Sequence, residues 1–354
     1  HFLFDSTLDI KNNVLVECIH TILNKQNLTE VQINSVTADI VDPTISSSYK
    51  AAILEGLRLK EESALENKCF QDFFYNLATH TQVNTPILID LATAYDGFNR
   101  YPNLLLGLPA LLGSIGFPTI IHGCKEVSPK FGITFHKCLV ELGLDPLKTI
   151  SEVQADLENS AIAWAYCDQQ HSFPQLHQLE PLRKAMVKRP VLATIEKFMQ
   201  PFYSKHQTFI VTGYTHPAYR NKTTALLQQL PHCTGFTFFR GVEGSCLAPI
   251  DRRCPVITQL KNKNATTEGF STPESFGFEL NKELSPDKTL TVQQSCDYVV
   301  TSLKDHKSTE AKWLIYNALT LLTELQLVTE KTPEELQNSI SSGKAWQHFS
   351  NSNY

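Results

Sequence analysis

The chain has 354 residues, of which 42% are hydrophobic and 19% charged, as in an ordinary globular protein. This length predicts two domains, or one large domain with a smaller one attached. No run of about 18 apolar residues occurs, so we expect no membrane span, and the opening HFLFDSTLDI lacks the apolar core of a signal peptide. Nine cysteines without CxxC spacing indicate reduced thiols, which predicts a cytoplasmic protein without a zinc site.

The net charge of −5 is unevenly distributed along the chain. Residues 183–253 contain eleven Lys and Arg but only three acidic residues, so the rest of the chain is strongly acidic. Two interpretations are open: the basic residues are scattered over a solvated surface, or they form one face that meets anions.

Apolar residues with helical spacing predict that residues 1–82 form a small helical bundle. The expected helices cover residues 10–23, a segment after Thr29, a segment after Ser46, and residues 69–77. Thr29 is a residue type that caps helix N-termini, and Ser46 to Ser48 are expected to open the third helix. We expect two copies of the chain to dimerise through this bundle, because it carries more apolar surface than it can bury alone, as Ile10, Ile19, Ile53 and Leu57 suggest.

From residue 83 to 354, strands and helices alternate, which predicts βαβ units and an α/β domain with a mostly parallel sheet. The expected strands cover residues 87–91, 119–122, 161–166, 208–212 and 235–239. The expected helices between them cover residues 104–115, 130–143, 152–159, 176–186 and 218–230. Polar residues 260–290 indicate a long excursion or a hairpin, and helices over residues 310–325 and 333–349 close the chain.

The loop that follows the first expected strand of this domain, ATAYDGFNRY, is the first candidate site. Open α/β sheets bind ligands at the carboxyl ends of their strands. Phosphate loops at that place are usually rich in glycine, so that backbone N–H groups can reach the anion. Here Gly97 is the single glycine. Asp96 and Arg100 therefore either line a site, or cap the next helix and pair with each other.

Several segments in the right order resemble the anthranilate phosphoribosyltransferase family of tryptophan biosynthesis (glycosyltransferase family 3), over nearly the whole chain. They are SSSYKAAILEGLRLKEES, HGCKEVSPKFGITFHKCLVELGLD, VTGYTHPAYRNKTTALLQQL, LIYNALTLL and SISSGKAW. The first is similar to a family signature that ends Leu-Arg-x-Lys-Gly-Glu-[Ser/Thr]. The resemblance implies a small N-terminal helical bundle, a larger α/β domain with a mostly parallel central sheet, and a homodimer.

The resemblance also implies a donor site for a phosphorylated sugar or nucleotide-like ligand. In the family, a Gly-Thr-Gly-Gly-Asp loop holds the pyrophosphate of phosphoribosyl pyrophosphate, and ATAYD stands there in this chain. The implied donor and phosphate-binding residues are Thr93, Asp96, Gly97, Arg100, Lys125, Ser128 and Lys130. His122 and Arg189 are implied on the acceptor side. Other interpretations stay open for both: a core histidine for His122 and a solvated cation for Arg189.

The metal motif of the family is altered. Family members hold Mg²⁺ on the sugar pyrophosphate with an adjacent Asp-Glu pair, whereas RGVEGSCLAP places Ser245 and Cys246 there and leaves Glu243 as a single carboxylate. A hard divalent ion prefers carboxylate oxygens, which neither Ser245 nor Cys246 supplies. We therefore assign no metal ligand and no catalytic residue from the sequence, although Mg²⁺ is the cofactor that the resemblance implies.

Two functions follow. The first is transfer of a pentosyl group from a phosphorylated ribose to a nitrogen or phosphate acceptor. The second is nucleic-acid binding without catalysis, since YDGxxR and RGxEGS resemble a bacterial subgroup of which one branch binds nucleic acid. Its expected phosphate contacts are Arg183, Lys184, Lys188, Arg189, Arg220, Lys222, Arg240, Arg252 and Arg253.

Overall fold

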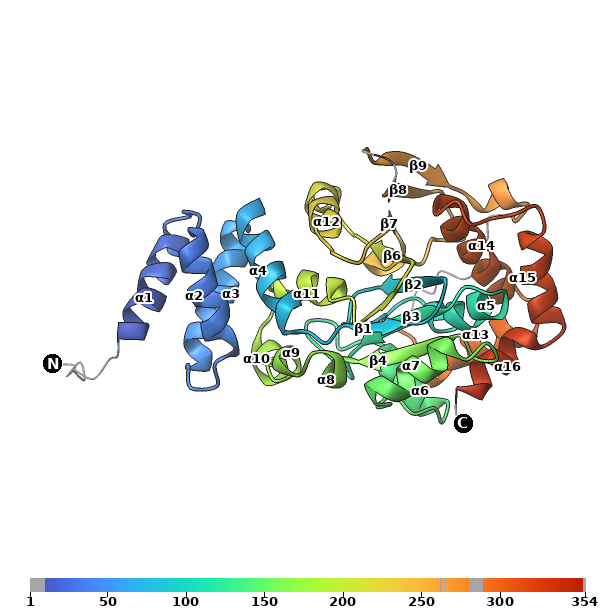
Figure 1. Ribbon diagram of the computed structural model, residues 1–354, viewed down its shortest axis with the longest axis horizontal. Helices are drawn as coiled ribbons and strands as arrows, with labels where there is room; N and C mark the ends of the chain where they lie inside the picture. The colour runs from blue at the N-terminus through green and yellow to red at the C-terminus, as the bar shows by residue number, and fades with distance from the viewer. Residues whose placement is uncertain (1–9, 262, 264, 280–288, 353–354) are drawn as a thin grey trace.

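The computed structural model describes residues 10–261, 263, 265–279 and 289–352, with side chains from residue 14 onward (Figure 1). The chain opens with four helices, α1 (Ile10–Leu23), α2 (Glu30–Val41), α3 (Ser47–Lys60) and α4 (Ala64–Leu77). Thr29 and Ser46 cap α2 and α3, as predicted. Ile53 and Leu57, expected to be surplus apolar surface, are instead fully buried. The side chain of Ile10 lies outside the described residues.

A seven-stranded sheet forms the centre of the α/β part, in the order β4-β3-β2-β6-β7-β8-β9. The first five strands are parallel and the last two antiparallel, which confirms the mostly parallel sheet. The strands are β2 (Ile87–Ala92), β3 (Thr119–Gly123), β4 (Trp164–Asp168), β6 (Gln207–Gly213), β7 (Gly235–Phe239), β8 (Cys254–Leu260) and β9 (Thr267–Ser271). A small separate sheet pairs β1 (Thr81–Val83) with β5 (Phe202–Ser204) in parallel.

Helices cover both faces of the sheet (Figure 1). The helices that contribute to the larger hydrophobic cluster are α5 (Leu108–Ser114), α6 (Phe135–Glu141), α13 (Val292–Lys304), α14 (Thr309–Glu324), α15 (Thr332–Ser341) and α16 (Lys344–Asn351). Those of the opposite cluster are α9 (Pro174–His177), α10 (Glu180–Ala185), α11 (Leu192–Ile195) and α12 (Tyr219–Gln228). Two further helices, α7 (Ile150–Glu158) and α8 (Gln169–Ser172), flank β4.

Several expected elements differ from the structure for local reasons. The helix expected from residue 130 begins at Phe135, because Phe131 has a positive φ of 49° and Thr134 caps the helix. The helix expected over residues 333–349 breaks into α15 and α16 at Gly343, whose φ is 80°. The strands β1, β5 and β8 and the helix α13 were not predicted.

One hydrophobic cluster joins the N-terminal helices to the α/β part. It contains buried residues of α1–α4, of α9–α12 and of the sheet, among them Phe70, Leu226 and Ile210. A hydrogen bond from Gln71 Nε2 to the carbonyl of Leu226 (3.0 Å) crosses the same boundary. The expected division between residues 82 and 83 falls within β1.

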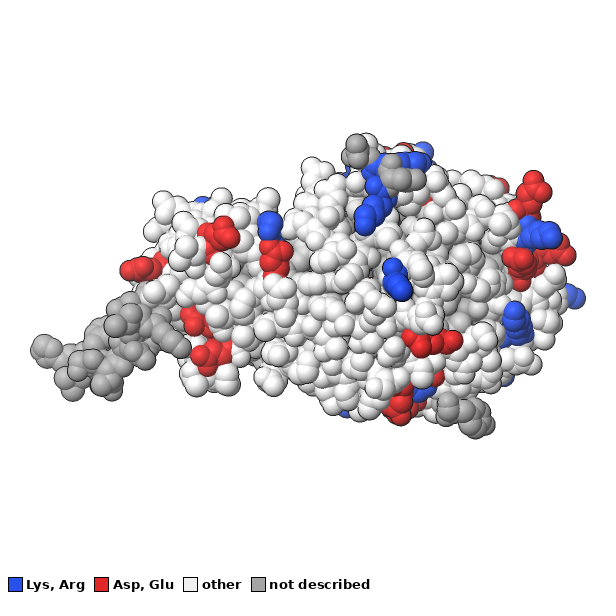
Figure 2. All heavy atoms as spheres, viewed as in Figure 1, with Lys and Arg blue, Asp and Glu red and all other residues white. Residues whose placement is uncertain are grey.

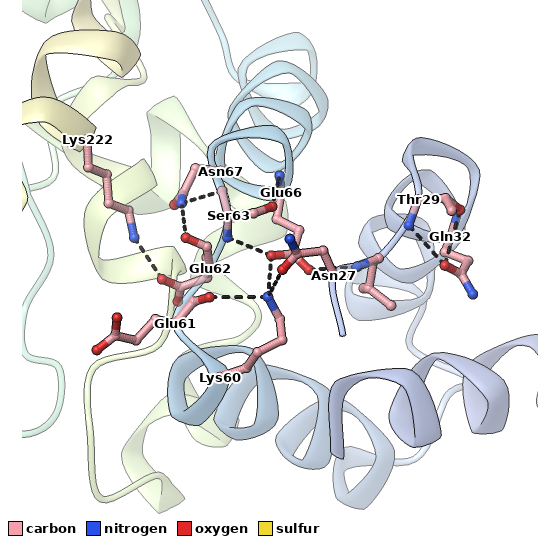
Figure 3. A network of polar contacts seen from close by, with 11 residues as sticks. Asn27, Thr29, Gln32, Lys60, Glu61, Glu62, Ser63, Glu66, Asn67 and Lys222 are labelled. Atoms are coloured by element: carbon pink, nitrogen blue, oxygen red, sulfur yellow. Dashed lines mark hydrogen bonds and ion pairs between the residues drawn. The ribbon is translucent and has the colours of Figure 1, made fainter. Parts of the chain in front are cut away.

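The turn between α3 and α4 is built around a buried ion pair (Figure 3). Lys60 Nζ lies 2.7 Å from Glu66 Oε2, and the two side chains are 3% and 0% exposed. Glu66 also accepts hydrogen bonds from the backbone N–H groups of Leu28 (2.9 Å) and Ser63 (2.7 Å). The adjacent Glu62 pairs with Lys222 of α12 at 2.7 Å. The LRLKEES signature therefore serves to hold helices together.

Candidate functional site

The candidate site that the sequence indicated follows β2, the central strand of the parallel sheet. All six residues of β2 are buried, and β3 and β6 flank it on either side. The following loop carries the candidate residues Thr93, Asp96 and Gly97. Gly97 has a φ of 75°, and a Cβ there would lie 2.7 Å from the Ile133 carbonyl. Only glycine fits this close approach.

A carboxylate from a distant turn is seated in this loop. Glu243 Oε1 accepts hydrogen bonds from the backbone N–H groups of Asn99 (3.0 Å), Arg100 (2.8 Å) and Tyr101 (3.1 Å). Three successive N–H groups that converge on one oxygen form an anion-binding nest. Lys130 completes it, with its ammonium 3.1 Å from Glu243 Oε2 and 3.0 Å from the Gly97 carbonyl.

The electrostatics of this contact match its geometry. Burial alone would raise the pKa of Glu243, but Lys130 and the three N–H donors outweigh burial and hold the pKa below its usual value. The Glu243 side chain is 5% exposed and the Lys130 side chain 18%. The loop after β2 and Lys130 thus bind a carboxylate of the chain itself.

Asp96 and Arg189 form a second polar contact of the loop. Arg189 Nε donates to Asp96 Oδ2 at 2.9 Å, and the guanidinium makes a further bond to the same oxygen. Asp96 is buried, whereas the Arg189 side chain is 45% exposed. Asp96 Oδ1 has no hydrogen-bond partner among the described residues. Asp96 therefore pairs with Arg189, which corrects the alternative that it pairs with Arg100.

His122, at the end of β3, is fully buried between two polar side chains. Its Nε2 lies 3.0 Å from Asp90 Oδ1, and its Nδ1 bonds to the hydroxyl of Tyr95. Tyr95 stands at a glycine position of the phosphate loop that the resemblance implied, and its ring fills that space. A cavity of only about 10 Å³ remains, lined by Thr93, Tyr95, His122 and neighbouring residues. Both ring nitrogens of His122 are thus engaged inside the protein.

The remaining expected donor residues are less closely tied to the loop. Arg100 and Lys125 have exposed side chains, although the N–H of Arg100 belongs to the anion nest. Ser128 is buried, and its hydroxyl donates to the Arg183 carbonyl. Ser128 and Lys130 lie in the loop before α6, and not at its first turn as expected.

The residues at the implied Mg²⁺ position do not fit a metal ion. Ser245 uses its hydroxyl to donate to the Val242 carbonyl (2.7 Å) and to accept from the N–H of Leu247 (3.1 Å). Burial raises the pKa of the Cys246 thiol to about 12, so the thiol stays neutral. Glu243 is occupied by the nest. Over the described parts of the chain, no group of three His, Cys, Asp or Glu side chains is placed to hold a metal.

Lys197 is a further cation beside the loop that the sequence did not single out. Its Nζ donates to the carbonyl of Gly213 (3.3 Å), the last residue of β6. Burial lowers the pKa of Lys197 to about 8, against the opposing influence of Glu196. Asp96 and Arg189 also act on this ammonium, so the three groups share one environment.

The cations expected to contact nucleic acid are mostly paired with acidic side chains. In the described part of the chain, six of the nine form ion pairs with carboxylates: Arg183, Lys184, Arg189, Arg220, Lys222 and Arg252. On the face in Figure 2, basic side chains gather in one small group over the β8–β9 hairpin, and the others lie singly, some of them next to acidic ones. The charge excess of residues 183–253 is therefore largely neutralised locally.

Comparison with known proteins gives relatives that include anthranilate phosphoribosyltransferases. No protein-family model matches the chain. A protein of Aquifex aeolicus, itself uncharacterized, is 25% identical over 299 residues, which are 84% of this chain and 88% of the relative. Anthranilate phosphoribosyltransferase of Cupriavidus metallidurans is 24% identical over 312 residues, 86% of this chain and 87% of that enzyme.

Solved structures agree with these relatives. Anthranilate phosphoribosyltransferase of Saccharomyces cerevisiae in complex with PRPP and Mg superposes with a TM-score of 0.78, at 12% identity and over 96% of this chain and 97% of that one. The anthranilate phosphoribosyltransferase of Thermus thermophilus superposes with a TM-score of 0.73 at 15% identity, over 94% of this chain and 97% of that enzyme. The helical N-terminus and the mostly parallel sheet give this chain the fold of anthranilate phosphoribosyltransferases. The chain is also similar to these enzymes in sequence, as its motifs predicted.

Proposed function

We propose that the protein binds a phosphorylated pentose at the carboxyl ends of β2, β3 and β6 and transfers its pentosyl group to a nitrogen or phosphate acceptor. The observation that carries the proposal is the convergence of three backbone N–H groups and Lys130 on one anion after the central strand. Relatives in sequence and fold are phosphoribosyltransferases, and a solved neighbour is a complex with PRPP and Mg.

Such a reaction needs mainly positioning and electrostatic stabilisation of an oxocarbenium-like centre as an anionic group departs. The nest and Lys130 would hold the departing phosphate. Asp96 Oδ1, buried and without a donor among the described residues, would face the positive charge that develops on the sugar. Arg189 would hold Asp96 in place and present its exposed edge to an anionic acceptor. None of these roles involves a metal ion.

Titration calorimetry tests the proposal. Phosphoribosyl pyrophosphate and ribose 1-phosphate are each titrated with and without Mg²⁺, and we expect binding that Mg²⁺ does not strengthen, because Ser245 and Cys246 supply no ligand. Lys130→Met should weaken binding at least about tenfold through loss of a charge-assisted contact. Lys137→Met is the control, because Lys137 pairs with Glu126 at 3.3 Å outside the nest. Absence of heat with both ligands at millimolar concentration would refute the proposal.

We also propose that two copies associate through the N-terminal helices. Leu23, Val31 and Leu59 are 67%, 79% and 74% exposed, and all lie close in sequence to the Asn27–Lys60 hydrogen bond (Figure 3). Exposed apolar side chains mark interfaces where they form one patch, and under this proposal these three form such a patch. Light scattering should give a dimer that Leu59→Glu converts to a monomer. Val187→Glu, at a position 76% exposed in another part of the chain, should leave the dimer intact.

A second candidate function, nucleic-acid binding, is favoured by one observation. Phe270 of β9 is 58% exposed, and the Arg253 guanidinium lies 4.4 Å from its ring centroid. An exposed aromatic ring with a stacked cation suits the bases of single strands. Gel shifts with short single-stranded DNA at two salt concentrations test it, with Phe270→Ala against the control Phe131→Ala at another exposed ring. Binding that ignores salt, or that both variants leave unchanged, would exclude this candidate.

A further inference from the structure

Glu243 is held as a bound anion would be held, although it belongs to the chain. Its carboxylate takes all three convergent N–H groups of residues 99–101 and the Lys130 ammonium. The partners lie 144 residues apart in sequence at Asn99, so the contact joins two separate loops. In chemical terms the two carboxylate oxygens stand in for two oxygens of a phosphoryl group.

The turn that carries Glu243 is held without help from its side chain. The N–H of Val242 donates to the Leu247 carbonyl at 2.8 Å, and the Ser245 hydroxyl donates to the Val242 carbonyl at 2.7 Å. Gly244, with a φ of 81°, packs against Thr215, which fixes the far side of the turn. Rotation of the Glu243 side chain alone would therefore empty the nest and leave the backbone in place.

We propose that Glu243 is a latch that closes the phosphate subsite in the free protein and that leaves it when a phosphoryl group binds. This inference rests on the proposed function and concerns the regulation of the same site. A phosphate dianion brings a third oxygen and a second negative charge to the same four donors, so the nest binds it more strongly than a carboxylate. The tethered carboxylate nevertheless competes at high effective concentration, because it needs no diffusion to return.

The latch predicts a specific change in affinity. If a ligand binds only the open nest, its apparent association constant is the intrinsic constant multiplied by the fraction of molecules in which the nest is open. If the latch is open in about one molecule in ten, its removal tightens phosphate binding about tenfold. A purely structural Glu243 predicts the opposite, since its loss would disorder the loop and weaken any ligand.

The test compares Glu243→Ala with the wild type, with inorganic phosphate and then pyrophosphate as probes. We expect calorimetry to show phosphate bound about tenfold more tightly by Glu243→Ala, and added phosphate to raise its unfolding temperature more than that of the wild type. Glu268→Ala is the matched control, because Glu268 pairs with Arg220 on the surface and its removal also frees a cation. Adding Lys130→Met to Glu243→Ala should abolish the gain.

The outcomes separate the two proposals. Phosphate affinity that is unchanged in Glu243→Ala, or raised equally in Glu268→Ala, overturns the latch. If Glu243→Ala does not fold, Glu243→Gln keeps the shape and removes the charge, and a failure to gain phosphate affinity there also overturns it. A gain in phosphate binding while no pentose phosphate binds to either form supports the latch and refutes pentosyl transfer. If pentose phosphates bind equally well to the wild type and to Glu243→Ala, the result supports the proposed pentose-phosphate site and refutes the latch.

Discussion

Breaking the buried pair between Lys60 and Glu66 should destabilise the protein far more than breaking an exposed pair on the same helix. Glu66→Ala would leave the Lys60 ammonium, 3% exposed, with only the Asn27 amide oxygen (2.8 Å) and the Glu61 carbonyl (3.1 Å). It would also strip the N–H groups of Leu28 and Ser63 of their acceptor. Removing one partner of a buried pair costs about 3–5 kcal/mol, and we expect about 4 kcal/mol here.

Urea denaturation at pH 7, followed by the fluorescence of the three tryptophans, measures this loss. Asp72→Ala is the control within α4, because Lys68 and Asp72 form an i,i+4 pair whose side chains are 51% and 48% exposed. That pair should contribute about 0.3–0.5 kcal/mol. An apolar replacement of both partners, Lys60→Met with Glu66→Leu, should recover only the part of the loss that comes from the unpaired ammonium, because the N–H groups of Leu28 and Ser63 still lack an acceptor. Equal destabilisation by Glu66→Ala and Asp72→Ala would refute the reasoning.

The same pair predicts a pH dependence with a defined sign. Burial alone would raise the pKa of Glu66, but Lys60 and the two N–H donors outweigh it, so the folded pKa lies below the ordinary value of 4.5. The stabilisation is therefore complete above that value and is lost as the pH falls through the lower folded pKa. The difference in unfolding free energy between the wild type and Glu66→Ala should shrink over that acid range.

Four other substitutions test further features of the structure. Glu61→Gly should stabilise the protein by about 1 kcal/mol, seen as a higher urea midpoint, because Glu61 has a φ of 67° at a family glycine position; an unchanged midpoint would contradict this. His122→Ala should lower the free energy of unfolding by about 3 kcal/mol or more, measured by thermal unfolding, because it leaves Asp90 buried without its partner. Tyr95→Phe removes one hydrogen bond to His122 and should lower it by about 1 kcal/mol. Equal losses of stability in the two variants would contradict this. Lys197→Met should be more stable than the wild type by about 3 kcal/mol below pH 8, because burial lowers the pKa of Lys197 from 10.5 to about 8. This advantage should vanish in calorimetry above about pH 10.5, where the wild-type amine is neutral in both states.

The regular helices and strands could be predicted because hydrophobic periodicity and helix caps are local features of the sequence. The five parallel strands follow apolar runs, and the predicted caps Thr29 and Ser46 begin α2 and α3. The strands β1 and β5 have three residues each, too few for a periodic signal, and exist because they pair across the chain. Helix α13 follows residues 280–288, which lie outside the described part.

The site was predictable in place but not in content. The position of the loop after the central strand, together with the family motifs, identified Asp96, Gly97 and Lys130 as candidate site residues. The partner of the loop, Glu243, is 144 residues from Asn99, and no spacing rule connects such distant positions. One signal was present: a single acidic residue beside a glycine in RGVEGS, at a turn where Glu243 takes a φ of 51°.

The pairing of β2 with β6 sets the order in which the protein can form during synthesis. Ala92 and Thr212, which pair in the sheet, lie 120 residues apart. At about 5–20 residues per second, ribosomes need about 6–24 s to make the intervening chain. Throughout that interval the edge of β2 that later pairs with β6 has no partner strand, and the nest of residues 99–101 waits still longer for Glu243. The nascent chain therefore carries an incomplete sheet with an unpaired strand edge, and the nest can be filled only after residue 243 has been made.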